Sequence, residues 1–293
     1  MVKLIKEIFK NRNWYLFIAP DMILFSIFII YPVFRTLYGS FFKWSLNQGS
    51  EFVAFANYTS LFHDRFFLSS FAKTALFGFT ITPLSMILGL ITALLVDSLK
   101  GWFKYFSRVA IFTPYVCALI VASVIWKSLL EPNGMVQSIL AMAGIITPAW
   151  LSDPKLSTLA IIIMTTWQTW GFNMIFYLAG LQTIPHTFHE AAMVDGASSW
   201  KRFWFITLPL LQPTTLFLLV YNTLTNLKMF DQVMGMTRGG PMNETLTTMI
   251  YIYQKAFSQH LFGVASAAAV VFALAIFGVS LVQMYLLRTQ VEY

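Results

Sequence analysis

Charged residues are scarce in this chain. Of its 293 residues, 11% are charged, whereas 58% are hydrophobic and 17% are aromatic. A soluble domain has about 25% charged residues, so this composition argues against an ordinary soluble protein. Several apolar runs reach the roughly 18 to 20 residues that are needed to cross the hydrocarbon core of a bilayer. Lipid is therefore the expected solvent for most of the chain.

Cysteine is almost absent. The one cysteine, Cys117, lies inside an apolar run. No disulfide can form within the chain, and we expect this side chain to be a small buried hydrophobe.

Three kinds of reaction chemistry are missing from the sequence. There is no GxxxxGK[ST] loop to hold nucleotide phosphates. No nucleophile and base stand together, so an enzyme active site is not indicated. No series of carboxylates or histidines runs through an apolar segment, as ion-coupled transport would need; Asp21, Lys228 and Asp231 fall near the ends of such segments. Any work that the protein performs must draw its energy from another chain.

The net charge of +7 does not indicate nucleic-acid binding. The basic residues flank the apolar runs, where they set the orientation of membrane segments. The basic start followed by an apolar run resembles a signal peptide, but this run is too long and has no small-residue cleavage site. We therefore expect an uncleaved first membrane helix.

The apolar runs predict an all-α polytopic membrane protein in one transmembrane domain, residues 1–293, with no internal repeat. Six transmembrane helices are expected at about 14–38, 71–97, 109–130, 157–181, 204–228 and 261–287. Pro20 and Asp21 suggest a broken turn in the first helix, and Pro209 and Pro213 should bend the start of the fifth. Loops are expected over 39–70, 98–108 and 229–260, and a short apolar piece over 135–146 should lie at the interface or against the bundle.

Six spans place both termini on the same side of the membrane. That side also receives the loops at 98–108 and 182–203, and its basic residues are denser than those of the opposite loops. They are Lys3, Lys6, Lys10, Arg12, Lys100, Lys104, Arg108, Lys201, Arg202 and Arg288. Basic density predicts that this side is cytoplasmic.

The stretch 190–209, EAAMVDGASSWKRFWFITLP, is polar and lies between two apolar segments. About twenty residues are more than a turn between helices needs, so we expect a surface that a partner outside the membrane grips. Two other interpretations of this stretch compete with that one. His186 and His189 beside Glu190 could form a metal site, but no further ligand has suitable spacing. An amphipathic helix on the bilayer surface would also fit, supported by Trp200, Lys201, Arg202 and Phe203.

The expected fourth and fifth helices carry neutral polar residues. Thr165, Thr169 and Asn173 are spaced four apart and share a helix face, as do Asn222 and Asn226. Amides, hydroxyls and aromatic rings suit a sugar, but the same residues commonly link membrane helices. The candidates for contact with a substrate are Thr166, Trp167, Gln168, Thr169, Trp170, Asn173, Asn222 and Asn226.

The stretch at 190–209 resembles the EAA loop of permease subunits of binding-protein-dependent ABC importers. Its fixed positions match at Glu190-Ala191-Ala192, Asp195-Gly196-Ala197, Phe203, Ile206 and Leu208-Pro209. The stretches APDMILFSIFIIYP, TPYVCALIVASVIWKSLLEPNG and FDQVMGMTRGGPMNET resemble the carbohydrate-uptake branch, of the maltose, glycerol-phosphate and multiple-sugar type. The likeness covers nearly the whole chain. It departs from the branch at FANY, where GL-D/E-NY is usual, and at Lys73-Thr74, where Asn-Thr is common.

The resemblance implies a type I ABC importer permease fold, in which a short cytoplasmic helix docks on an ATPase. By that resemblance Glu190, Ala191, Ala192, Asp195, Gly196 and Ala197 couple the chain to the ATPase. It implies a multi-pass protein of the bacterial cell membrane that imports a carbohydrate, expected to be an oligosaccharide. The implied partners are a second homologous permease subunit in a heterodimer, two ATPase subunits and an extracytoplasmic solute-binding protein.

The resemblance also implies that this chain is not an enzyme. It binds no cofactor and no metal itself, because ATP and Mg belong to the partner ATPase, and it binds no nucleic acid. Three alternatives remain: the same architecture carrying glycerol-phosphate or another small polar solute, a self-contained channel or secondary carrier, and a membrane scaffold that transports nothing.

Overall fold

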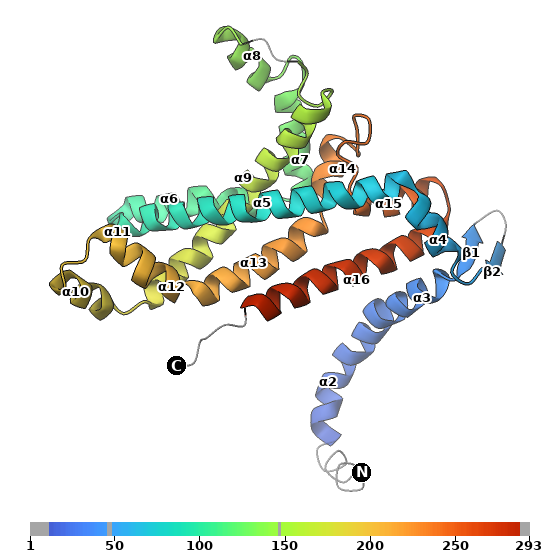
Figure 1. The fold of residues 1–293 in the computed structure, drawn as a ribbon, viewed down its shortest axis with the longest axis horizontal. Helices are drawn as coiled ribbons and strands as arrows, with labels where there is room; N and C mark the ends of the chain where they lie inside the picture. The colour runs from blue at the N-terminus through green and yellow to red at the C-terminus, as the bar shows by residue number, and fades with distance from the viewer. Residues whose placement is uncertain (1–11, 46–48, 146–147, 288–293) are drawn as a thin grey trace. The chain divides into compact units, whose positions relative to one another are not determined.

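The computed structural model describes residues 12–45, 49–145 and 148–287. Most of the described chain is helical (Figure 1). The chain forms two compact units, one of Met1–Asp64 with Ile252–Phe272 and one of Arg65–Tyr251 with Ala273–Tyr293. The prediction that the whole chain is one transmembrane domain stays a prediction.

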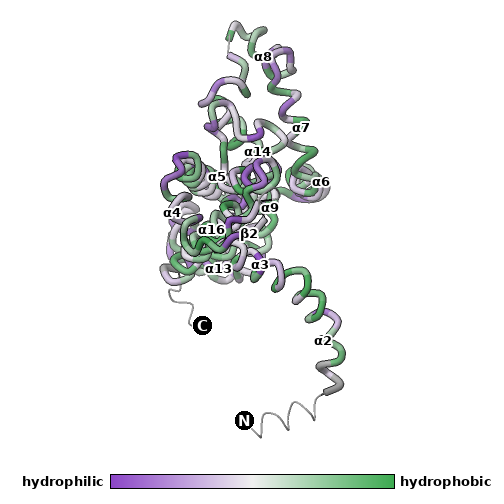
Figure 2. The backbone as a smooth tube through the Cα atoms, turned by 90° about the vertical axis from the view of Figure 1, so that its right-hand side faces the viewer, coloured by the Kyte–Doolittle hydropathy of each residue, from purple (hydrophilic) through white to green (hydrophobic). Residues whose placement is uncertain are grey.

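The first unit begins with the first predicted span. It consists of α2 (Arg12–Phe25), the π-helix η1 (Ser26–Ile30) and α3 (Tyr31–Gly39), and the backbone along α2 has mostly hydrophobic residues (Figure 2). Pro20 and Asp21 lie inside α2, so the predicted broken turn there is wrong. A membrane helix tolerates one missing N–H donor, and the irregular turn comes at η1 instead.

The segment after this span is structured. Strands β1 (Phe42–Ser45) and β2 (Gly49–Phe52) pair antiparallel with Phe42 opposite Phe52, and α4 (Ala56–His63) follows. The Asn57 side chain donates from Nδ2 to the carbonyl oxygens of Ser40, at 2.8 Å, and Phe42, at 2.9 Å. The predicted loop over 39–70 is therefore wrong, because a buried amide organises the backbone into a hairpin and a helix.

The second unit is built on three helices: α5 (Arg65–Ser98), α9 (Pro154–Thr183) and α13 (Gln212–Leu227). Helix α5 packs along both α9 and α13. A Cβ atom at Gly89 would lie 2.5 Å from Cβ of Asn173, so glycine is what allows α5 and α9 to approach at this point. Pro83 lies within α5 without ending it.

The predicted third helix is broken. Helices α6 (Gly101–Val116) and α7 (Leu119–Leu130) meet at a sharp bend, with 96° between Gly101–Val116 and Leu119–Met142. The prediction of one continuous helix over 109–130 is wrong. The prediction of a basic loop over 98–108 is wrong as well, because α6 starts at Gly101 and includes Lys104 and Arg108. Pro114, inside α6, has no N–H to donate to the preceding turn. Cys117 has an extended backbone and is exposed, so the prediction that its side chain is buried is wrong.

The segment after α7 includes α8 (Met135–Met142), which covers part of the predicted apolar piece; the end of that piece, at residue 146, lies outside the described residues. Counted with each bent pair as one span, up to six apolar helical segments could cross a membrane, and four are single long helices. This agrees with the expected six spans.

The chain from α9 to the C-terminal helix contains more helices than predicted. After α10 (His186–Val194) come α11 (Ser199–Arg202), the π-helix η2 (Phe203–Thr207) and α12 (Leu208–Leu210). The bend of 63° at Leu211 confirms that Pro209 and Pro213 distort the start of this span. The predicted loop over 229–260 instead holds α14 (Asp231–Met236), α15 (Thr248–Tyr253) and the π-helix η3 (Gln254–Ser258), before α16 (Phe262–Leu287).

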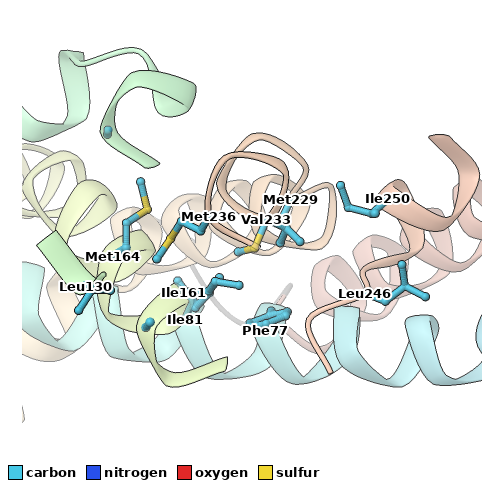
Figure 3. Packing of buried hydrophobic residues seen from close by; sticks show 12 residues of the cluster. Phe77, Ile81, Leu130, Ile161, Met164, Met229, Val233, Met236, Leu246 and Ile250 are labelled. Atoms are coloured by element: carbon cyan, nitrogen blue, oxygen red, sulfur yellow. The ribbon is translucent and has the colours of Figure 1, made fainter. Parts of the chain in front are cut away.

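One hydrophobic cluster of the second unit joins α5, α7, α9 and the α14–α15 segment (Figure 3). It consists of Phe77, Ile81, Ala122, Leu130, Ala160, Ile161, Met164, Met229, Val233, Met236, Leu246 and Ile250. Because these side chains come from both ends of the sequence of this unit, the segment at 229–250 is fixed to α5, α7 and α9.

The predicted membrane orientation stays a prediction. Lys3, Lys6, Lys10 and Arg288, which contribute to the charge argument, lie outside the described residues. The side chain of Arg12 does so as well.

Candidate functional site

The polar stretch between the fourth and fifth spans forms a separate short helix. Helix α10 (His186–Val194) begins directly after Pro185, whose φ is −61°. Proline fixes φ near −65° and has no N–H to leave unpaired, so it suits the residue at which a new helix starts. The short helix expected at this point is therefore present.

The end of α10 explains the Asp-Gly-Ala part of the motif. The N–H of Ala197 donates to the carbonyl of Ala192 at 2.8 Å, and the N–H of Gly196 donates to that of Met193 at 3.1 Å. Gly196 has a φ of +73°, the left-handed conformation that commonly ends a helix and that glycine adopts without a penalty. The six predicted coupling residues thus form the second half of α10 and its terminating turn.

No residue of α10 is buried within this chain. Glu190, Ala191, Asp195 and Gly196 are exposed, while Ala192 and Ala197 are half-buried. Sequence reasoning missed three apolar residues beside them: Phe188 is 52% exposed, Met193 52% and Val194 89%. Apolar side chains on an exposed helix indicate a contact surface. Their presence in an otherwise polar loop was the feature of the sequence from which this surface could have been predicted.

Most of the predicted substrate candidates lie in the interior of the second unit. Thr166, Gln168, Thr169, Asn173, Asn222 and Asn226 are all at most 6% exposed. Trp170 is half-buried. Trp167 is 36% exposed, and its ring lies 5.6 Å from that of Trp126.

Several of these candidates link helices. Asn222 donates from Nδ2 to Oδ1 of Asn173 at 2.7 Å and so joins α13 to α9. Asn226 donates to Oγ1 of Thr82 at 3.0 Å and joins α13 to α5. Gln168 donates from Nε2 to the carbonyl of Tyr115 at 3.2 Å, next to the break between α6 and α7. The linking interpretation therefore applies to these three side chains, and substrate contact stays a prediction for all eight.

Among the candidates, three buried polar atoms have no hydrogen-bond partner in the described structure: Thr166 Oγ1, Trp170 Nε1 and Asn173 Nδ2. Their positions are four and three residues apart, so they lie on one face of α9. Buried polar groups are nearly always hydrogen-bonded. These three groups are therefore donors that the described chain itself leaves unpaired.

An aromatic cluster that sequence reasoning missed lies beside these groups. Phe172 stacks on Tyr115 with ring centres 4.7 Å apart and on Tyr221 at 4.8 Å. Phe176 stacks on Phe217 at 5.1 Å, and the hydroxyls of Tyr115 and Tyr221 are 2.9 Å apart. The rings come from three helices, α6, α9 and α13. The sequence shows only that Phe172 and Phe176, and Phe217 and Tyr221, are each four residues apart; it does not show that the helices bring these rings together.

Comparison with known proteins gives a consistent result. Residues 85–290 match the family model described as "Binding-protein-dependent transport system inner membrane component". The lactose transport system permease protein LacF of Rhizobium radiobacter is 36% identical over 285 residues, which cover 96% of this chain and 95% of that protein. The sulfoquinovosyl glycerol transport system permease protein SmoG of Agrobacterium fabrum is 37% identical over 278 residues, which cover 94% of this chain and 90% of SmoG. The sn-glycerol-3-phosphate permease protein UgpA of the same organism is 33% identical, over 98% of each chain.

A similar fold occurs in a solved structure. A chain of a bacterial ABC transporter that imports the acidic polysaccharide alginate has a TM-score of 0.84 at 23% identity, with 98% of each chain covered. At that identity the likeness concerns the fold. It confirms the predicted importer-permease architecture.

Proposed function

This chain belongs to the family of binding-protein-dependent transport system inner membrane components, and from that premise we propose that it is one membrane subunit of an ATP-driven importer for a carbohydrate. In this proposal a second, homologous permease chain completes the transport path. Two ATPase subunits bind and hydrolyse ATP with Mg on the cytoplasmic side, where both termini and α10 lie. A solute-binding protein delivers the substrate on the other side, and the chain itself catalyses no reaction.

The observation that carries the proposal is the exposed helix α10 at the end of α9. Helix α9 has 30 residues and is therefore about 45 Å long, enough to cross the bilayer. Glu190, Asp195 and the apolar residues Phe188 and Val194 offer a mixed docking surface on α10. Movement of a docked ATPase would pass directly into α9 and α11, which flank α10, and would rock the helices between two states of access.

A carbohydrate is favoured as the substrate by the residues of the interior. The polar side chains that α9 and α13 bury are neutral, whereas a phosphate ester would call for Arg or Lys. Thr166, Trp170 and Asn173 supply unpaired donors for sugar hydroxyls, and the partly exposed ring of Trp167 supplies a face for C–H groups. The names of relatives include transport of lactose and of sulfoquinovosyl glycerol, which supports the same class. Transport of glycerol-phosphate, which a relative's name states, is the second candidate.

The proposal is tested with the complex co-purified from cells that express this chain with its partners. Its ATPase activity is measured with the solute-binding protein empty and loaded in turn with a panel of saccharides and with glycerol-3-phosphate. We expect stimulation by at least one saccharide-loaded form. Stimulation by glycerol-3-phosphate alone would overturn the substrate class, and failure to recover an ATPase with this chain would overturn the importer.

A further inference from the structure

The helical segment that leads into the fifth span is sharply bent. It consists of α11, η2 and α12, residues Ser199–Leu210, and lies at 63° to α13, Gln212–Leu227. We call residues 199–210 the bent segment. Helix α13 packs along α5 and α9, as a helix that crosses the bilayer with them. A segment at 63° to such a helix runs mainly along the surface of the bilayer and not across it.

One face of the bent segment is exposed, aromatic and basic. Trp200 is 69% exposed, Trp204 46% and Phe205 79%, and Lys201 is exposed as well. The ring centres of Trp200 and Trp204 lie 5.7 Å apart, so these side chains stand on the same side of the helix. Tryptophan rings beside basic side chains are typical of the boundary between the headgroups and the hydrocarbon of a bilayer.

Arg202 has a donor that the described chain leaves unused. Its Nη2 donates to Oγ of Ser199 at 3.1 Å, but its buried Nε has no hydrogen-bond partner in the described structure. The arginine side chain stays charged, and an unpaired donor that is shielded from water destabilises the structure. A phosphate group beside the guanidinium would supply the missing acceptor, because the two groups match in geometry.

The bent segment carries charge of one sign. No acidic residue lies between Ser198 and Leu211, whereas Lys201 and Arg202 are both basic. The segment therefore attracts an anionic partner. Helix α10 differs, because its surface includes the exposed Glu190 and is followed by the exposed acidic residue at 195. The two surfaces are neighbours in the sequence but fit partners of opposite charge.

The bent segment lies on the same side of the membrane as α10. Helix α10 ends at Val194 and α11 begins at Ser199. The connection between these two residues reaches at most about 19 Å when it is fully extended, less than the roughly 30 Å of the hydrocarbon core. Both elements are therefore cytoplasmic in the proposed function, on which the following inference rests.

We propose that the bent segment is a binding site for anionic phospholipids of the cytoplasmic leaflet. Lys201 and Arg202 bind the phosphate groups, and the rings of Trp200, Trp204 and Phe205 enter the boundary of the acyl chains. Lipid is the occupant because the segment continues directly into a spanning helix, which holds its rings at the level of the bilayer. Of the competing interpretations of this polar stretch, the surface helix then applies to the bent segment and partner docking to α10.

The test identifies the lipid neighbours of a fluorophore on the exposed face. In a Cys117→Ser background, Phe205→Cys is labelled with a bimane, and the purified complex is placed in phosphatidylcholine nanodiscs. Increasing fractions of phosphatidylcholine or phosphatidylglycerol with a nitroxide high on one acyl chain are added, and the signal of the labelled background is subtracted. Both lipids should quench, and phosphatidylglycerol should bind about fivefold more tightly. The matched control is Val194→Cys on α10, a position that is 89% exposed and should be quenched much less by either lipid.

Charge variants are measured through the same label at position 205. Lys201→Gln should lower the preference for phosphatidylglycerol about threefold, and Lys201→Gln with Arg202→Gln should bring the two lipids within about twofold of each other. Because Lys201 is exposed, the single variant does not depend on the packing around Arg202. The control is Lys100→Gln, which removes an exposed basic residue in front of α6 and should leave the preference unchanged.

Quenching at position 205 that is no stronger than at position 194 would overturn the inference and assign the face to a protein partner. Equal binding of the two lipids would overturn it as well, and so would equal losses of preference for Lys100→Gln and Lys201→Gln. Stimulation of ATPase activity by the loaded solute-binding protein is measured in the same nanodiscs. Normal stimulation without quenching at 205 rejects the lipid site alone, whereas quenching without any stimulation rejects the proposed function alone.

Discussion

Thr166 and Thr169 are the same residue type, three positions apart on α9, and both side chains are buried. The hydroxyl of Thr169 donates to the carbonyl of Thr165 at 2.8 Å, whereas the hydroxyl of Thr166 has no partner in the described structure. A hydroxyl that bonds only to its own helix is not available to a ligand. Of the two, Thr166 is therefore the candidate for substrate contact in the proposed function, and Thr169 serves as its matched control.

Replacement with the isosteric valine tests this difference. Thr166→Val should raise the substrate concentration for half-maximal uptake by about three- to tenfold, because one hydrogen bond contributes about 0.5–1.5 kcal/mol. Thr169→Val loses a bond within its own helix and should change that concentration less than twofold. The measurement is uptake of labelled saccharide into proteoliposomes. Equal effects of the two substitutions would show that the unpaired hydroxyl does not meet the substrate.

Gly196 ends α10 with a φ of +73°, and a Cβ atom there would meet nothing within 4 Å. Substitution therefore costs backbone strain of about 1–2 kcal/mol and causes no clash within this chain. We expect Gly196→Ala, and more strongly Gly196→Asp, to lower uptake per ATP hydrolysed while the complex still assembles. Gly144→Ala is the matched control, because Gly144 has a φ of +75° and equally open surroundings. Loss of coupling in both variants would assign the effect to strain and not to the docking surface.

At the scale of elements, glycines set how closely the central helices approach. A Cβ atom at Gly171 on α9 would lie 2.1 Å from the carbonyl oxygen of Ile111 on α6, and backbone cannot move as a side-chain tip can. Gly171→Ala should therefore destabilise the purified protein by about 1–3 kcal/mol. Gly278→Ala on α16 meets nothing within 4 Å and should be neutral. The check is the apparent Tm in detergent; equal Tm values for the two variants would contradict the close packing of α6 on α9.

The amide links between helices carry a second prediction at this scale. Asn226 of α13 bonds to Thr82 of α5 inside the second unit. A double-mutant cycle with Asn226→Ala and Thr82→Val should give a coupling energy of about 0.6 kcal/mol, the average for such bonds in membrane proteins. Uptake measured on the same variants separates a helix-linking role of Asn226 from contact with the substrate. Lower uptake by an intact complex, together with no coupling energy, would favour substrate contact over a helix link.

The sequence predicted the number of spans and the boundaries of α9 to within a few residues, because long apolar runs determine both. It did not predict the break at Cys117 and Ala118, since the residues on either side are equally apolar and hydropathy does not detect a bend. The hairpin after α3 was missed for another reason. It depends on the buried Asn57 amide, a tertiary contact with no signature in sequence. The motif placed α10 correctly because Pro185 and Gly196 act through local backbone geometry, which sequence does encode.

At the scale of the whole molecule, the chain leaves two of its helical segments without a covering from its own residues. Residues Leu16–Gly39 bury none of their apolar window within this chain, and α10 buries no residue. The first observation requires lipid or another protein around the first span, and the second fits a soluble partner. The candidate sites for ATPase and substrate follow one another along α9: α10 lies after its last turn, and the unpaired donors lie near its middle.

In the proposed function, the second half of α10 and its terminating turn, residues 190–197, couple ATP hydrolysis in a partner to carbohydrate uptake. The most direct measurement is uptake of labelled saccharide together with ATP hydrolysis, in proteoliposomes that contain the full complex with either the unsubstituted chain or Glu190→Lys. We expect uptake that needs both ATP and the loaded solute-binding protein. For Glu190→Lys at normal membrane levels, we expect the saccharide carried per ATP hydrolysed to fall about tenfold or more. Uptake by this chain alone without ATP, or an unchanged ratio in the variant, would contradict it.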